Sequence, residues 1–97
     1  MRIDWHSEAR QDLQEFDKRI QEHLMGQVGA MEEAPLGDDT SLLSKQGLEI
    51  FRLKLKNSRL DHRIFFDLDG DRVIILGVEH RDNAYTQESI EKIKSRK

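Results

Sequence analysis

The sequence predicts an α+β fold in which helices pack on one side of an antiparallel sheet. Three features lead to this prediction: helical apolar spacing in the first third, strand-like alternation in the second half, and an Asp69-Gly70 hairpin signal. The predicted order is strand, helix, helix, strand, strand, strand, helix (β-α-α-β-β-β-α). A chain of 97 residues suffices for one hydrophobic core but not two, so we expect a single domain over 1–97.

The first third carries one short strand followed by a helical stripe. Residues 1–5 alternate apolar and polar, as a strand with one buried face does. Ser7 can cap a following helix. Two glycines weaken the stripe and Asp17 can cap a second helix, so a helical hairpin and one long helix both fit; the predicted order uses the hairpin. The stripe recurs at steps of three or four residues, at Ala9, Leu13, Phe16, Ile20 and Leu24.

The second half changes to strand-like periodicity. Residues 35–47, rich in Gly, Asp and Ser, predict a loop. The run 48–56 predicts a strand with one apolar face, and the run 62–68 predicts a second strand. The nearly continuous apolar run 72–80 predicts a strand covered on both faces, at the centre of the sheet. A last helix from about residue 86 to 95 would bury Ile90 and Ile93.

Composition limits the compartment and the chemistry. No apolar run approaches the roughly 20 residues of a membrane span, and the N-terminus lacks a secretory apolar stretch, so we expect a cytoplasmic protein with no membrane partner. The sequence contains no cysteine, which excludes disulfides, a thiol nucleophile and cysteine-ligated zinc. We expect no cofactor and no metal. The stretch 67–71 resembles an acidic calcium loop but lacks the downstream glutamate and fits a hairpin better.

Positive charge is concentrated in one part of the chain. The net charge is −3, which argues against a nucleic-acid partner, but six of the cations lie within 45–63 against two carboxylates. Three of these cations form a row on one face of the predicted strand. Such a row could bind along a phosphate backbone, although a sheet face exposed to solvent also explains it. This row consists of Arg52, Lys54 and Lys56.

Four further residues turn the row into a candidate site. Arg63 lies on the next strand within a run that is otherwise apolar. A charged side chain is unusual in such a segment, which suggests a function for Arg63. Arg81 and Tyr85 follow the last strand, and with Lys54 and Arg63 they could converge on one concave surface. Tyr85 alone is explained as a helix-entry contact, and His80 alone as a strand-end histidine bonded to backbone.

At these residues the sequence resembles the RelE/ParE toxin superfamily. The resemblance rests on the ordered set of segments 51–55, 62–66 and 78–85, together with the opening around residues 7–13, and it spans nearly the whole chain. It implies a microbial RNase-like fold and cleavage of messenger RNA in the ribosomal A site. In that reaction the 2′-hydroxyl attacks the adjacent phosphate and leaves a 2′,3′-cyclic phosphate.

The resemblance also implies a role for each candidate residue. Arg63 would stabilise the transition state, Arg81 would assist the leaving 5′-oxygen, and Lys54 would activate or neutralise the attacking 2′-oxygen. Tyr85 would orient the nucleophile or stack on a splayed base. The remaining candidates, Arg52, Lys56 and His80, match basic positions that hold RNA in family members.

Two partners follow from the resemblance besides the ribosome and messenger RNA. One is a cognate antitoxin, which would cover the basic strand face or displace the C-terminal helix; with only Ile90 and Ile93 as apolar anchors, that helix should dock weakly. The other is DNA gyrase, the target in the alternative function, because the ParE branch shares the fold and poisons gyrase without cutting RNA. Retention of Arg63, Arg81 and Tyr85 favours the nuclease.

Overall fold

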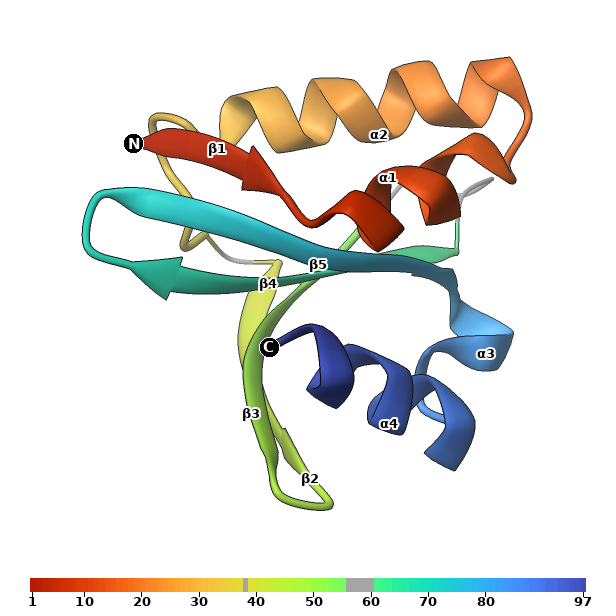
Figure 1. The fold of residues 1–97 in the computed structure, drawn as a ribbon. Helices are drawn as coiled ribbons and strands as arrows, with labels where there is room; N and C mark the ends of the chain where they lie inside the picture. The colour runs from red at the N-terminus through yellow and green to blue at the C-terminus, as the bar shows by residue number, and fades with distance from the viewer. Residues whose placement is uncertain (38, 56–60) are drawn as a thin grey trace.

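The computed structural model describes residues 1–37, 39–55 and 61–97, in which a five-stranded sheet forms the middle layer (Figure 1). The strand order is β1-β5-β4-β3-β2. Strands β3, β4 and β5 pair antiparallel as predicted, and an additional strand, β2, pairs antiparallel with β3. Strand β1 pairs with β5 in parallel, so the sheet is mixed. The strands are β1 (Arg2–Trp5), β2 (Thr40–Lys45), β3 (Leu48–Lys54), β4 (His62–Asp69) and β5 (Arg72–His80).

Helices cover both faces of the sheet, which confirms the α+β class but corrects the prediction that they pack on one side (Figure 1). Helices α1 (Ser7–Gln14) and α2 (Lys18–Ala30) lie on one face. Helices α3 (Arg81–Ala84) and α4 (Gln87–Arg96) lie on the other, and α3 was not predicted. Within the described part of the chain, no helix combines the length and the apolar character that crossing a membrane requires.

Two helical layers are needed because the inner strands are apolar on both faces. On the first face, Phe66 and Ile75 form one buried cluster with Leu24 of α2. On the second, Phe65 and the C-terminal helix residue Ile90 are buried in another cluster. Neighbouring strand residues point to opposite faces, so the adjacent phenylalanines of β4 serve both cores.

The helical hairpin is confirmed, and one of its two predicted caps is correct. Asp17 caps α2, with its Oδ1 accepting a hydrogen bond from the N–H of Ile20 at 3.0 Å. The cap of α1 is His6 rather than Ser7, since His6 Nδ1 accepts from the N–H of Glu8 at 3.1 Å. The imidazole nitrogen supplies the acceptor that Ser7 was expected to provide.

Strand β2 lies where the sequence predicted a loop, and it changes which strand is central. It pairs with β3 through a two-residue turn whose residues, Gln46 and Gly47, have φ of 53° and 81°, as a type I′ hairpin requires. Leu42 of β2 is exposed and only Leu43 packs on a core, so the segment lacks a strong strand pattern. With β2 at one edge, β4 becomes the middle strand; β5 is covered on both faces as predicted but lies next to β1.

Helix α4 is anchored by more than its two predicted apolar residues. Ile90 and Ile93 are buried as expected, but the Arg96 guanidinium is also buried, and it forms an ion pair with Asp12 of α1 at 2.6 Å. Arg96 Nη1 donates to the carbonyl of Leu76 at 2.9 Å. Gly77 allows α4 to approach closely here, because a Cβ at this position would overlap Cδ1 of Ile93 unless that side chain shifted.

Candidate functional site

Arg63 of β4 is a buried cation that points toward the C-terminal helices. It shares its sheet face with Phe65 and is 8% exposed. Its Nη1 donates to the carbonyl of His62 at 3.1 Å, and its Nε donates to the hydroxyl of Tyr85 at 3.2 Å. Burial and two hydrogen bonds hold the guanidinium in one orientation.

Arg52 of β3 approaches the same hydroxyl. Its Nη1 donates to Tyr85 Oη at 2.8 Å, and its Cζ lies 5.3 Å from the centroid of the tyrosine ring. Its Nη2 donates to Ser41 Oγ at 2.8 Å, while its Nε is buried with no hydrogen-bond partner among the described residues. Two guanidinium groups therefore converge on one oxygen atom, and we call Arg52, Arg63 and Tyr85 the arginine–tyrosine cluster.

The two arginines of this cluster carry uncompensated charge. In residues 1–37, 39–55 and 61–97, no carboxylate lies within 4.0 Å of either guanidinium. Arg72, by contrast, is neutralised, because it pairs with Asp4 and Asp69 at 3.0 Å each. Fixed, unpaired guanidinium groups attract an anion, and their planar donors match phosphate oxygens.

Of the remaining predicted catalytic residues, Lys54 lies beside the cluster, whereas Arg81 makes no hydrogen bond with it. Lys54 is the register partner of Arg63 at the end of β3, so it shares the same face, and its side chain is exposed. Arg81 begins α3 and is exposed; its side chain makes no hydrogen bond or ion pair with any described residue. The predicted convergence thus holds for Arg63 and Tyr85, while Lys56 lies outside the described residues.

Two residues of the cluster's surroundings were missed, because both lie on the unpredicted strand β2. Ser41 accepts a hydrogen bond from Arg52, and Lys45 Nζ donates to the carbonyl of Tyr85 at 3.0 Å. Lys45 Nζ also lies 6.0 Å from the centroid of the tyrosine ring. Lys45 belongs to the cations within 45–63, but only the pairing of β2 with β3 shows that it and Ser41 lie at the site.

His80 holds the start of α3, whose C-terminal cap is Tyr85. Its Nδ1 accepts a hydrogen bond from the N–H of Asp82 at 3.2 Å, as expected for a histidine at the end of a strand that bonds to the backbone. Its ring lies 5.2 Å from the ring of its cross-strand partner His62. Burial is the main cause that lowers the pKa of His62, and the nearby His80 adds to it, so His62 packs as a neutral ring against Phe16. A role of His80 in holding RNA stays a prediction.

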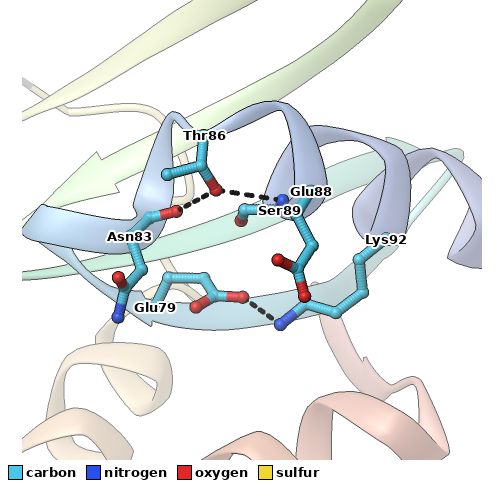
Figure 2. Close-up of a pocket in the computed structure, with 6 residues that line it drawn as sticks. All are labelled: Glu79, Asn83, Thr86, Glu88, Ser89 and Lys92. Atoms are coloured by element: carbon cyan, nitrogen blue, oxygen red, sulfur yellow. Dashed lines mark hydrogen bonds and ion pairs between the residues drawn. The ribbon is translucent and has the colours of Figure 1, made fainter.

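A polar pocket of about 320 Å³ lies apart from the cluster, between β5, α3 and α4 (Figure 2). An ion pair between Glu79 and Lys92 closes one side of it, and Thr86 bridges Asn83 and Ser89 by hydrogen bonds of 3.1 Å on another. No member of the arginine–tyrosine cluster lines it. Across the described ranges, no group of three or more histidine or acidic side chains is placed to hold a metal ion.

Comparison with known families identifies one match over most of the chain. The sequence pattern of the family described as "ParE toxin of type II toxin-antitoxin system, parDE" matches residues 3–85. This range contains the whole arginine–tyrosine cluster. No curated protein matches the chain.

Solved structures with the same fold come from bacteria and archaea. The RelBE2 toxin–antitoxin complex of Mycobacterium tuberculosis matches with a TM-score of 0.70 and 23% identity, covering 82% of this chain and 96% of that one. A mutant of the Escherichia coli toxin RelE in the free state matches with a TM-score of 0.71 and 15% identity, covering 98% of this chain and 95% of that one. The archaeal RelE–RelB complex of Pyrococcus horikoshii matches with a TM-score of 0.68 and 21% identity, covering 86% of this chain and 97% of that one. At these identities the likeness is one of fold.

Proposed function

We propose that this chain, which belongs to the family of ParE toxins of type II toxin–antitoxin systems, cleaves messenger RNA in the ribosomal A site. The observation that carries the proposal is the convergence of two guanidinium groups, from Arg52 and Arg63, on the hydroxyl of Tyr85, neither with a carboxylate partner in the part of the chain that the structure describes. Such a pair is suited to stabilise a phosphate whose negative charge increases in the transition state, because the two guanidinium groups are already in position and need not reorganise.

The proposed reaction is an internal phosphoryl transfer that uses no metal ion. The 2′-oxygen of the RNA attacks the adjacent phosphorus, so a bond forms between them while the bond from phosphorus to the 5′-oxygen breaks. The proton of the 2′-hydroxyl leaves to a base, and the departing 5′-oxygen takes up a proton. The products are a 2′,3′-cyclic phosphate and a 5′-hydroxyl end, and the nuclease accelerates their formation chiefly by charge stabilisation.

The roles of individual residues follow from their positions in and around the cluster. Arg63 is buried and fixed, so it stabilises the charge on the phosphate oxygens; Arg52 holds the same phosphate. Tyr85 orients the 2′-hydroxyl from the cap of α3. The exposed cations at the rim complete the site, with Lys54 beside the attacking oxygen and Arg81 at the leaving oxygen.

The proposed partners are the ribosome with its messenger RNA, and a cognate antitoxin. Support for the antitoxin comes from structural neighbours that are toxin–antitoxin complexes, namely RelBE2 of Mycobacterium tuberculosis and the archaeal RelE–RelB complex. An antitoxin that neutralises this chain would cover the arginine–tyrosine cluster, because its two fixed guanidinium groups attract an acidic partner.

Poisoning of DNA gyrase is the second candidate, and two observations favour it. The matching family is the ParE family, and the net charge of −3 is unusual for a protein that binds ribosomal RNA. A gyrase poison would need the fold as a binding surface but not the two converging arginines. Their convergence is the reason that the nuclease is preferred.

Expression of the chain in bacteria separates these two functions. We expect growth arrest together with new 5′ ends within coding sequences, detected by primer extension on total RNA, and no increase in gyrase-linked DNA breaks. Breaks in DNA with intact messenger RNA would refute the nuclease and establish the gyrase function. Rescue of growth by the neighbouring gene would support the antitoxin partner.

A further inference from the structure

Helix α4 lies beside the β2–β3 hairpin, and two lysines make hydrogen bonds around this contact (Figure 1). Lys45 of β2 donates from Nζ to the carbonyl of Tyr85 at 3.0 Å. Lys94 of α4 donates from Nζ to the carbonyl of Gln46, the residue after Lys45, at 2.9 Å. Both ammonium groups are thus held in place by neutral backbone oxygens.

A carbonyl fixes an ammonium group without cancelling its charge. Among the described residues, neither Lys45 nor Lys94 has a carboxylate within 4.0 Å. Lys97, by contrast, lies 3.9 Å from Asp67. Glu91, one helical turn before Lys94, instead accepts a hydrogen bond from Gln87 at 3.4 Å. Lys45 and Lys94 therefore present full positive charge in defined positions.

These lysines continue the charge of the arginine–tyrosine cluster. Lys45 contacts Tyr85 through its carbonyl, while Arg52 contacts the same residue through its hydroxyl. From Arg63 the unpaired cations follow one another through Arg52 and Lys45 to Lys94. A line of cations beside an aromatic ring is typical of surfaces that bind a single nucleic-acid strand.

We propose that Lys45 and Lys94 form a second phosphate-binding site, which holds the single strand of RNA on one side of the scissile phosphate. The proposal rests on the proposed function, because it takes the cluster as the place where the strand is cut. It adds that contact extends beyond the cut nucleotide, across β2 and onto α4. Each lysine that neutralises a phosphate releases a counterion, so binding through this site depends on salt.

The test is the salt dependence of binding to a single-stranded RNA that carries 2′-O-methyl groups throughout and cannot be cut. Fluorescence anisotropy at 50 to 200 mM salt gives the slope of log affinity against log salt. Lys45→Gln and Lys94→Gln should each reduce the slope by about 0.7, so that the loss of affinity over this range becomes about 2.6-fold smaller. Lys94→Arg should keep the wild-type slope, because it keeps the charge.

Lys18→Gln is the matched control, since Lys18 is an exposed cation on α2, on the opposite face of the sheet, and its slope should stay unchanged. Wild-type slopes in both Lys45→Gln and Lys94→Gln would overturn the second site even if the chain cuts RNA. Reduced slopes in a chain that cuts no RNA would support the second site and refute the nuclease. Equal reductions on duplex DNA would overturn the assignment to single-stranded RNA.

Discussion

Replacing Arg63 with alanine should lower the rate of RNA cleavage by about 100- to 1,000-fold, the usual effect of removing one fixed donor to a developing charge. The guanidinium is buried and donates to Tyr85, so it is held in one position before the substrate binds. The measurement is single-turnover cleavage of messenger RNA on programmed ribosomes. Circular dichroism should show that the variant remains folded.

Arg72→Ala is the control for a general loss of positive charge. Arg72 lies at the other end of the neighbouring strand, where Asp4 and Asp69 neutralise it, so its removal should leave cleavage within about twofold of wild type. Arg63→Lys should fall between wild type and Arg63→Ala, because lysine keeps the charge but not the planar donors. Full activity in Arg63→Ala would contradict the proposed role of the cluster.

Replacing Asp12 with alanine should lower the free energy of unfolding by about 3–5 kcal/mol, the cost of removing the buried partner of a buried charge and leaving only the exposed Glu8 beside it. β1 pairs only with the first four residues of β5, up to Ile75. Beyond that point Asp12 accepts from the N–H of Val78 at 3.4 Å, while Arg96 donates to the carbonyl of Leu76 at 2.9 Å. The ion pair thus replaces a missing strand and joins α1 to α4.

Urea unfolding measures this effect. Glu8→Ala is the matched control, because Glu8 contacts the same arginine at 3.2 Å but its side chain is 54% exposed, and we expect a loss of less than about 1 kcal/mol. Asp12→Asn keeps a hydrogen-bonding side chain and should unfold at an intermediate urea concentration. An Asp12→Ala variant as stable as Glu8→Ala would show that the pair does not hold α4.

The elements predicted correctly are those with a strong local pattern. The amphipathic stripe, the Asp17 cap and the apolar run of β5 each depend on nearby residues only. Strand β2 was missed because an edge strand buries little, and α3 was missed because four residues show no helical period. The ion pair between Asp12 and Arg96 joins residues far apart in the chain, and no local pattern reports such a pair.

The same distinction explains which parts of the site were found. Arg63 was noticed because a cation inside an apolar strand is unusual, and its neighbours on the sheet followed from strand alternation. Arg52 was expected only to hold RNA, yet it makes the shorter of the two hydrogen bonds to Tyr85. Lys45 and Ser41 depend on the missed strand, so their contacts became visible only with the pairing of β2 and β3.

The most direct test of the central claim is cleavage of ribosome-bound messenger RNA in which a single 2′-hydroxyl, next to the scissile phosphate, is replaced by hydrogen. If the arginine–tyrosine cluster supports attack by that hydroxyl, the unmodified RNA will be cut and its new end will carry a 2′,3′-cyclic phosphate. The deoxy-substituted RNA will then remain intact at that position. Cleavage of the deoxy-substituted RNA at the same bond would contradict the mechanism, and an uncut unmodified RNA would contradict the nuclease itself.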